Sequence, residues 1–136
     1  MTEDAGLDVT YFSRLDAAEC WALLSEVELG RVAWQGDDGI VVLPVNFRLV
    51  DHAIVFQTAP GSLLSRLAEP TEVAFQADEI DTESAVGWTV LVQGTTRTAS
   101  AEDADPVSWL DGDRPVWVAI DEGAVSGRVM SGTKRS

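Results

Sequence analysis

Two hydrophobic periodicities follow one another along the chain, a helical one first and an alternating one afterwards. Cys20, Leu23, Leu24 and Val27 recur at the spacing of one helix face. Asp16, followed three residues later by Glu19, forms a capping-box pattern at the start of this stretch. The pattern predicts a helix over residues 16–27.

From residue 30 onward the period changes to two, and the runs are rich in β-branched and aromatic residues. Pro44 stands inside one run and predicts a bulge or an exposed edge, because proline cannot donate to a strand ladder. A short helix is expected at 62–68, and a turn at Glu122-Gly123. The predicted strands are 30–35, 39–50, 52–58, 71–80, 87–100, 116–121 and 124–130.

The order and length of these elements predict a mainly β fold with small helices. Six or seven strands with mostly short connections favour an antiparallel sheet, and closure into a barrel removes its edges. We expect one domain over residues 1–136, with loose tails at 1–12 and 131–136. Residues 101–115 read as a loop with a helical turn.

The charge of the chain narrows the classes of partner. The formal net charge is −14, and the single lysine is Lys134. Nucleic-acid affinity comes largely from lysine and arginine on phosphates, so no nucleic-acid partner is expected. Docking on an anionic membrane surface is disfavoured for the same reason. No apolar run approaches the length that spans a bilayer, and we expect a cytoplasmic protein.

Few side chains suggest catalysis or metal binding. One cysteine, Cys20, and one histidine, His52, exclude an internal disulfide, a zinc cluster and an evident nucleophilic triad. The carboxylates at 78–81 could bind calcium, although a solvated loop explains them as well. Trp109 lies in a loop, where it either packs or stacks on a planar ligand. No metal site is predicted, and catalytic residues stay unknown.

The loop before the second helix is a candidate anion site. Ser62 follows Gly61 at a predicted helix start, which offers backbone N–H groups and a hydroxyl to a phosphate. No lysine or arginine stands in the loop itself.

Several segments in order resemble the FMN-binding split-barrel superfamily. The closest likeness is to small actinobacterial pyridoxamine 5′-phosphate oxidase-like proteins, which are related to nitroimidazole-resistance proteins. The resemblance runs from about residue 15 to 130. It rests on "ECWALLSEVELGRVAW", "VVLPVNFRLVDHAIVFQTAPGSLLSRL", "EVAFQADEID" and "GWTVLVQGTTRTAS". It implies a split barrel that forms a homodimer, with FMN sites at the subunit interface.

The resemblance also implies a set of cofactor-binding residues. The backbone of Val45, Asn46 and Phe47 would border the flavin ring. Trp88 would lie near the site or the interface, and Trp109 matches a loop tryptophan that can approach the ring. The residues implied around the ribityl phosphate are Phe56, Gln57, Thr58, Ser62 and Leu63.

This sequence departs from the family pattern at the phosphate. The family run resembles "FRT-x-x-G-[ST]-K-L", whereas Gln57 replaces its arginine and Leu63 replaces its lysine. Losing two charge-assisted hydrogen bonds costs roughly 3–6 kcal/mol, or about a hundred- to ten-thousand-fold in affinity. Arg66, one turn after Ser62, could compensate. The sequence does not determine to which face of the sheet Arg48 and Arg97 point.

Three functions are compatible with these residues. The first is an FMN-dependent oxidoreductase of unidentified substrate that transfers hydride at the flavin ring. The second is a split barrel with lost or weakened FMN binding, which binds another small molecule or a partner. The third uses a deazaflavin or another planar cofactor. The histidine of nitroimidazole reductases has no match, because His52 lies in a turn.

Overall fold

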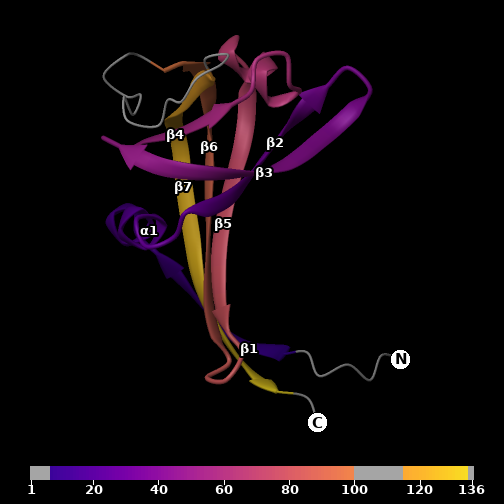
Figure 1. The fold of residues 1–136 in the computed structure, drawn as a ribbon. Helices are drawn as coiled ribbons and strands as arrows, with labels where there is room; N and C mark the ends of the chain where they lie inside the picture. The colour runs from indigo at the N-terminus through magenta and orange to yellow at the C-terminus, as the bar shows by residue number, and fades with distance from the viewer. Residues whose placement is uncertain (1–6, 100–114, 135–136) are drawn as a thin grey trace.

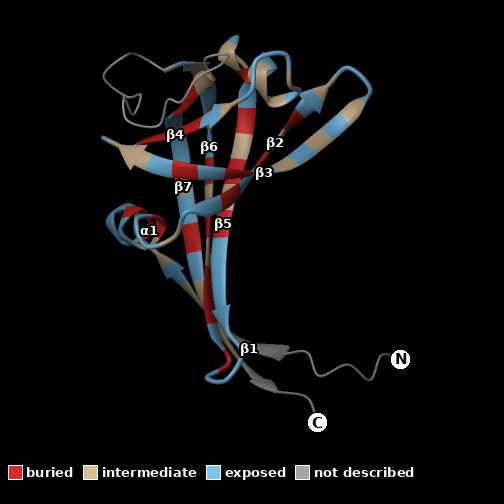
Figure 2. Ribbon diagram, viewed as in Figure 1, coloured by how far each residue is buried: buried red, intermediate tan, exposed pale blue. Residues whose placement is uncertain are grey.

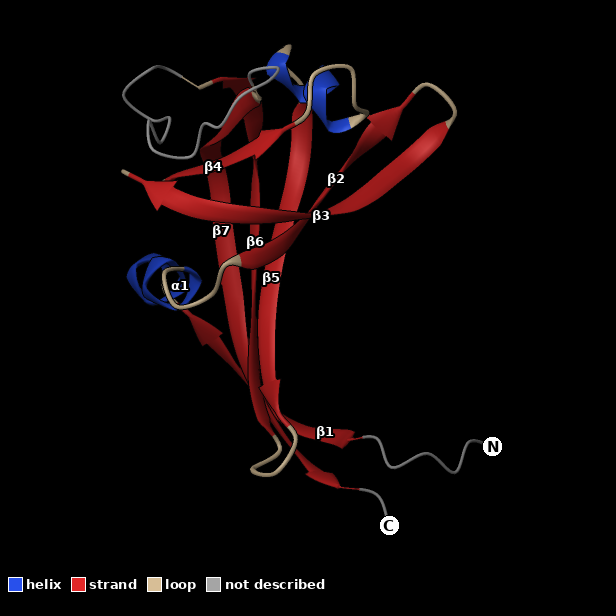
Figure 3. Ribbon diagram, viewed as in Figure 1, coloured by secondary structure: helices blue, strands red, loops and turns tan. Residues whose placement is uncertain are grey.

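Seven strands and two short helices make up the computed structural model, which describes residues 7–99 and 115–134 (Figures 1 and 3). In chain order they are β1 (Leu7–Leu15), α1 (Ala17–Leu24), β2 (Leu29–Gly36), β3 (Gly39–Val50), β4 (Ala53–Thr58), the 3₁₀ helix η1 (Leu64–Ala68), β5 (Glu72–Asp81), β6 (Val86–Thr98) and β7 (Val116–Lys134). Each strand predicted between residues 30 and 100 is therefore present, with ends shifted by one or two residues.

All the strand pairings are antiparallel, and they close the sheet on itself. The strand order is β1-β7-β4-β3-β2-β5-β6, and a further pairing joins β6 back to β7. Strand β7 consequently pairs with β1, β4 and β6 along different parts of its length. Figure 1 shows β5, β6 and β7 running together down the molecule, while β3 and β4 run across the direction of these three strands near its upper end. The predicted split barrel is confirmed.

The core lies inside this closed sheet, where alternate residues of the strands point inward (Figure 2). Phe47 and Phe75 meet edge to face there, with ring centroids 4.8 Å apart. The largest fully buried apolar side chains are Phe56, Phe75, Leu24, Ile54, Leu67, Ile120, Val32, Val55, Val90, Val92 and Val118. The alternating pattern therefore identified the core strands correctly.

Helix α1 covers one side of the barrel. Of the face predicted from its spacing, Cys20 and Leu24 are buried, while Leu23 and Val27 are partly buried against the core. Trp21, which the spacing did not include, is also buried. The capping box is confirmed, because the backbone N–H of Glu19 donates to Asp16 Oδ1 at 2.8 Å and that of Asp16 donates to Glu19 Oε1 at 2.9 Å. The helix ends at Leu24, three residues before the predicted end.

The prediction of loose tails was wrong for the described parts of both ends. Residues 7–12 belong to β1, and residues 131–134 belong to β7. The two segments pair with each other, with Leu7 opposite Lys134 and Phe12 opposite Met130. Residues 131–134 contain no apolar side chain, so this end of β7 gave no alternating signal in the sequence.

The turn predicted at Glu122-Gly123 was also wrong. Residues 116–134 form one continuous strand, and Gly123 is an extra residue in its register with β6. Gly94 pairs with Glu122 and Gln93 with Ala124, which is the pattern of a β-bulge. A bulge and a turn attract the same residue types, so composition alone did not separate them.

Pro44 lies on an edge, as expected. It pairs with Arg31 of β2, while the pairing of β3 with β4 begins only at Phe47. The proline therefore interrupts no ladder on its open side. Among the described helices, none has the length and apolar character needed to cross a membrane.

Candidate functional site

A cleft of about 440 Å³ opens between β3, β4 and β7. Its position follows from the strand register, because Phe47 pairs with Phe56 across β3 and β4, and Gln57 pairs with Trp117 across β4 and β7. The lining residues are Glu28, Pro44, Val45, Asn46, Phe47, Arg48, Val55, Phe56, Gln57, Leu64 and Trp117. Five residues proposed from the sequence, Val45, Asn46, Phe47, Phe56 and Gln57, are thus brought together.

The cleft lies on the outer face of β3 and β4. The side chains of Val45, Phe47 and Phe56 belong to the barrel core, so these residues border the cleft through their backbone. The backbone at Phe47 is already used, since its N–H donates to the carbonyl of Glu28 at 2.9 Å. On the outer face, Val55 packs beside Trp117, and Asn46 and Gln57 are exposed. A planar molecule could therefore rest on Val55 and Trp117 and bond to the two amide side chains.

Two residues that sequence reasoning did not place in the site stand at its edge. The Arg48 guanidinium lies 5.7 Å from the ring centre of Trp117, within reach of a cation–π contact. Among the described residues that line the cleft, Arg48 is the one basic side chain. The sequence showed that Arg48 is a charged residue inside an otherwise apolar strand. It could not show to which face of the sheet the side chain points, because that depends on the strand register.

The loop proposed to hold a phosphate uses its polar groups locally. The hydroxyls of Thr58 and Ser62 lie 2.8 Å apart, and Ser62 Oγ donates to the carbonyl of Ala59 at 2.7 Å. The backbone N–H of Ser65 donates to Ser62 Oγ at 3.2 Å. The predicted helix over 62–68 is the five-residue 3₁₀ helix η1 (Leu64–Ala68), so Ser62 stands two residues before its first residue rather than at the helix start.

The remaining predicted phosphate contacts lie apart from the cleft. Leu63 is 45% exposed and is not among the lining residues. Arg66 donates to Asp37 Oδ2 at 2.8 Å, across to the turn between β2 and β3. Arg97 is likewise engaged, with its Nε donating to Asp121 Oδ2 at 2.7 Å.

Of the two candidate tryptophans, the structure describes one. Trp88 is 8% exposed in the barrel core and lies on β6, outside the cleft lining. Trp109 falls outside the described residues. The tryptophan that the structure brings to the cleft is Trp117.

Other side chains considered from the sequence have structural partners. His52 stacks on Trp21, with ring centroids 4.6 Å apart and planes at 4°, and its Nδ1 lies 3.9 Å from Glu122 Oε1. Asp78 lies 3.8 Å from Arg31, which accounts for one of the carboxylates at 78–81. Burial raises the pKa of the Cys20 thiol, with smaller contributions from nearby Asp16 and Glu19.

The position of the cleft and the closed sheet can be compared with known proteins. A family model described as pyridoxamine 5′-phosphate oxidase matches residues 16–129. The chain belongs to the pyridoxamine 5′-phosphate oxidase family. The match includes α1 and both strands of the β3–β4 pair, and it confirms the resemblance found in the sequence.

Similar proteins support the same family. An FAD-binding protein from Mycobacterium smegmatis is 33% identical, with a TM-score of 0.74 over 87% of this chain and 97% of that one. An FAD-binding protein from Mesorhizobium loti has a TM-score of 0.71 at 23% identity over 93% and 99% of the chains, which supports the fold alone. An uncharacterized protein of Mycobacterium tuberculosis is 28% identical over 83% of this chain and 82% of its own.

Proposed function

We propose that the cleft between β3, β4 and β7 binds a flavin, and that the chain acts as a flavin-dependent oxidoreductase of unidentified substrate. The observation that carries the proposal is the convergence of Val45, Asn46, Phe47, Phe56 and Gln57 on one cleft. Two similar solved proteins are named as FAD-binding. FMN is the form that the sequence resemblance favours.

The cleft fits the ring of a flavin better than its phosphate. The apolar side chain of Val55, two amide side chains and an indole are groups that hold a flat, hydrogen-bonding heterocycle. For the phosphate, Gln57 is neutral, and Arg48 is the basic side chain that lines the described cleft. The bound flavin would supply hydride or electron transfer, while Asn46, Gln57 and Trp117 orient it.

This imbalance gives the proposal a specific test. Apoprotein is titrated with FMN and with riboflavin, and quenching of flavin fluorescence is followed. If the ring dominates binding, we expect the two dissociation constants to lie within about tenfold of each other, because a charge-assisted phosphate contact would separate them further.

Restoring the family's charges should then act on FMN alone. The double variant Gln57→Arg with Leu63→Lys should tighten FMN binding by about a hundredfold or more, and leave riboflavin unchanged. The matched control is Gln93→Arg with Val86→Lys, which adds the same two charges at exposed positions of β6 that do not line the cleft. Equal tightening in the control would mean that net charge, not contact, is responsible.

One result would overturn the flavin proposal. If neither flavin binds the wild-type protein or the double variant, the cleft does not hold a flavin ring. The chain would then be a split barrel that binds a different small molecule. The replacement of the family's arginine and lysine by Gln57 and Leu63 favours this second candidate function.

A homodimer is part of the same proposal. Exposed apolar side chains cluster on β2 and β3, with Leu29 at 55% and Val42 at 56% exposure, and Leu29 pairs with Asn46 of the cleft. Covering these side chains would remove apolar area from water. Light scattering should give twice the 14.6 kDa chain mass, and a monomer at micromolar concentration would contradict this part.

A further inference from the structure

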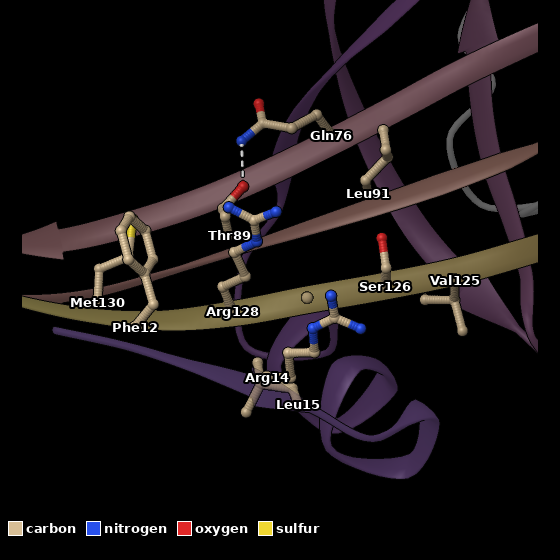
Figure 4. A pocket seen from close by; sticks show the side chains of 11 residues that line it. Phe12, Arg14, Leu15, Gln76, Thr89, Leu91, Val125, Ser126, Arg128 and Met130 are labelled. Carbon is tan, nitrogen blue, oxygen red and sulfur yellow. Dashed lines mark hydrogen bonds between the residues drawn. The ribbon is translucent and has the colours of Figure 1, made fainter.

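A second and larger groove, of about 660 Å³, lies against the far part of β7. It is bordered by β1, β5 and β6 as well, so four strands contribute side chains to it (Figure 4). The residues that line it are Phe12, Arg14, Leu15, Gln76, Thr89, Leu91, Val125, Ser126, Gly127, Arg128 and Met130.

Two arginines stand directly opposite each other in this groove. Arg14 of β1 pairs with Arg128 of β7 in the antiparallel register, and both are exposed. Figure 4 shows both guanidinium groups on the side that faces the groove. Like charges directly opposite across two strands are destabilising, with Cβ atoms only about 5 Å apart. Such a pair is an unexpected arrangement in a chain with a net charge of −14.

Among residues 12–99 and 115–132, no carboxylate lies within ion-pair distance of either arginine. Other arginines of the described chain are paired: Arg31 with Asp78, Arg66 with Asp37 and Arg97 with Asp121. Asp78 lies opposite Thr89, which in turn lies opposite Arg128. The nearest carboxylate in this cross-strand row is therefore engaged by Arg31.

The surroundings of the pair are apolar and hydroxylic. The Arg128 guanidinium lies 5.6 Å from the ring centre of Phe12, which keeps it extended over the aromatic face. Leu91, Val125 and Met130 supply apolar surface, and none of the lining residues is acidic. Thr89 Oγ1 accepts from Gln76 Nε2 at 2.8 Å, so the neighbouring amide is already fixed.

This groove is distinct from the flavin cleft of the same chain. From Trp117 at the cleft to Arg128 is eleven residues of one strand, roughly 35 Å at about 3.3 Å per residue. The two sites share β7 and no lining residue.

We propose that the groove binds a small organic acid, with its carboxylate or phosphate held between Arg14 and Arg128 and its apolar body against Leu91 and Val125, which lie on the same side of the two arginines (Figure 4). Two guanidinium forks on one anion form the charge-assisted, bidentate contacts that arginine favours. The same anion removes the repulsion between the two cations.

The test is a set of titrations of the full chain by calorimetry at low salt. The probes are phenyl phosphate and hexanoate, with inorganic phosphate and benzyl alcohol reporting the charge and the apolar body separately. We expect one or both of the first two probes to bind more tightly than either partial probe. Whichever of them binds tighter identifies the acidic group.

Single variants then assign the site. Arg14→Gln and Arg128→Gln should each weaken binding of the acidic probe by about tenfold or more. Arg66→Gln removes an equally exposed arginine outside the groove and should change nothing. Thermal denaturation of each variant provides a check on folding, and removal of one of two opposed cations should leave the melting temperature unchanged or raised.

Three results would overturn the proposal. Equal affinity in all variants would place the anion elsewhere. Loss of the dimer in Arg14→Gln or Arg128→Gln would mean that carboxylates of a second copy hold the arginines. Weakened flavin binding in the same variants, measured in parallel, would assign the arginines to the flavin site, while failure of flavin binding in all proteins bears only on the proposed function.

Discussion

Gly94 is a position where the fold permits no side chain. A Cβ atom built there would lie 2.0 Å from the carbonyl oxygen of Asp121, because the bulge at Gly123 brings the backbones of β6 and β7 together. The sequence showed a glycine within a strand, which is compatible with a bulge, a bend or a weak spot. Only the register between two segments about thirty residues apart identifies the reason.

We therefore expect Gly94→Ala to destabilise the protein by about 2–4 kcal/mol, since backbone rather than a flexible side chain must move. Urea denaturation measures the change. Thr95→Ala, at an exposed neighbouring position of the same strand, should stay within about 0.5 kcal/mol of wild type. A Gly94→Ala protein of wild-type stability would show that the strands can separate at the bulge without cost.

The residues of the candidate site also fall into two groups: those that the local sequence predicts, and those that only the pairing of distant strands reveals. Val45, Asn46, Phe47, Phe56 and Gln57 could be predicted because the family motif is local in sequence. Trp117 could not, since it reaches the cleft only through the pairing of β4 with β7.

Among the elements, α1 is held to the barrel by an aromatic contact at a turn. His52 occupies the β3–β4 turn with φ of 67°, and its ring stacks on Trp21 of the helix. The sequence correctly predicted both the helix and the turn. It could not predict that they touch, because about thirty residues separate them and a lone histidine in a turn has no periodic signal.

Replacing His52 by asparagine removes the stacked ring but keeps a residue type that tolerates positive φ. We expect a loss of about 0.5–1.5 kcal/mol in unfolding free energy and a change in the near-ultraviolet circular dichroism of the tryptophans.

Glu122→Gln serves as the control for the contact between His52 Nδ1 and Glu122 Oε1. The His52 side chain in that contact is 65% exposed, so the control should lie within about 0.5 kcal/mol of wild type. If His52→Asn matches the control, the ring contact does not hold the helix.

At the scale of the whole molecule, repulsion between the negative charges destabilises the folded state. A net charge of −14 on 136 residues produces self-repulsion that is largest in the compact state. The composition alone established this repulsion, whereas the local excess of positive charge at Arg14 and Arg128 became visible only with the register of β1 and β7.

Screening should therefore stabilise the protein. Raising sodium chloride from about 0.02 to 0.5 M shortens the Debye length from roughly 20 Å to about 4 Å. We expect the melting temperature to rise by about 3–6 °C, the shift produced by roughly 1 kcal/mol in a domain of this size. Differential scanning fluorimetry at fixed pH measures it, and a melting temperature that falls with salt would show that attractive ion pairs outweigh the repulsion.

The length of β7 determines how the native protein can open. This strand hydrogen-bonds to β1, β4 and β6 in turn, so neither end of the barrel can unzip while the other stays intact. The backbone amides of Val118, Ala119 and Ile120, all fully buried, should therefore exchange with deuterium only through global unfolding, with one common free energy of opening. A ligand in either groove would slow exchange at both ends of the strand by the same factor, since both report on a single cooperative unit.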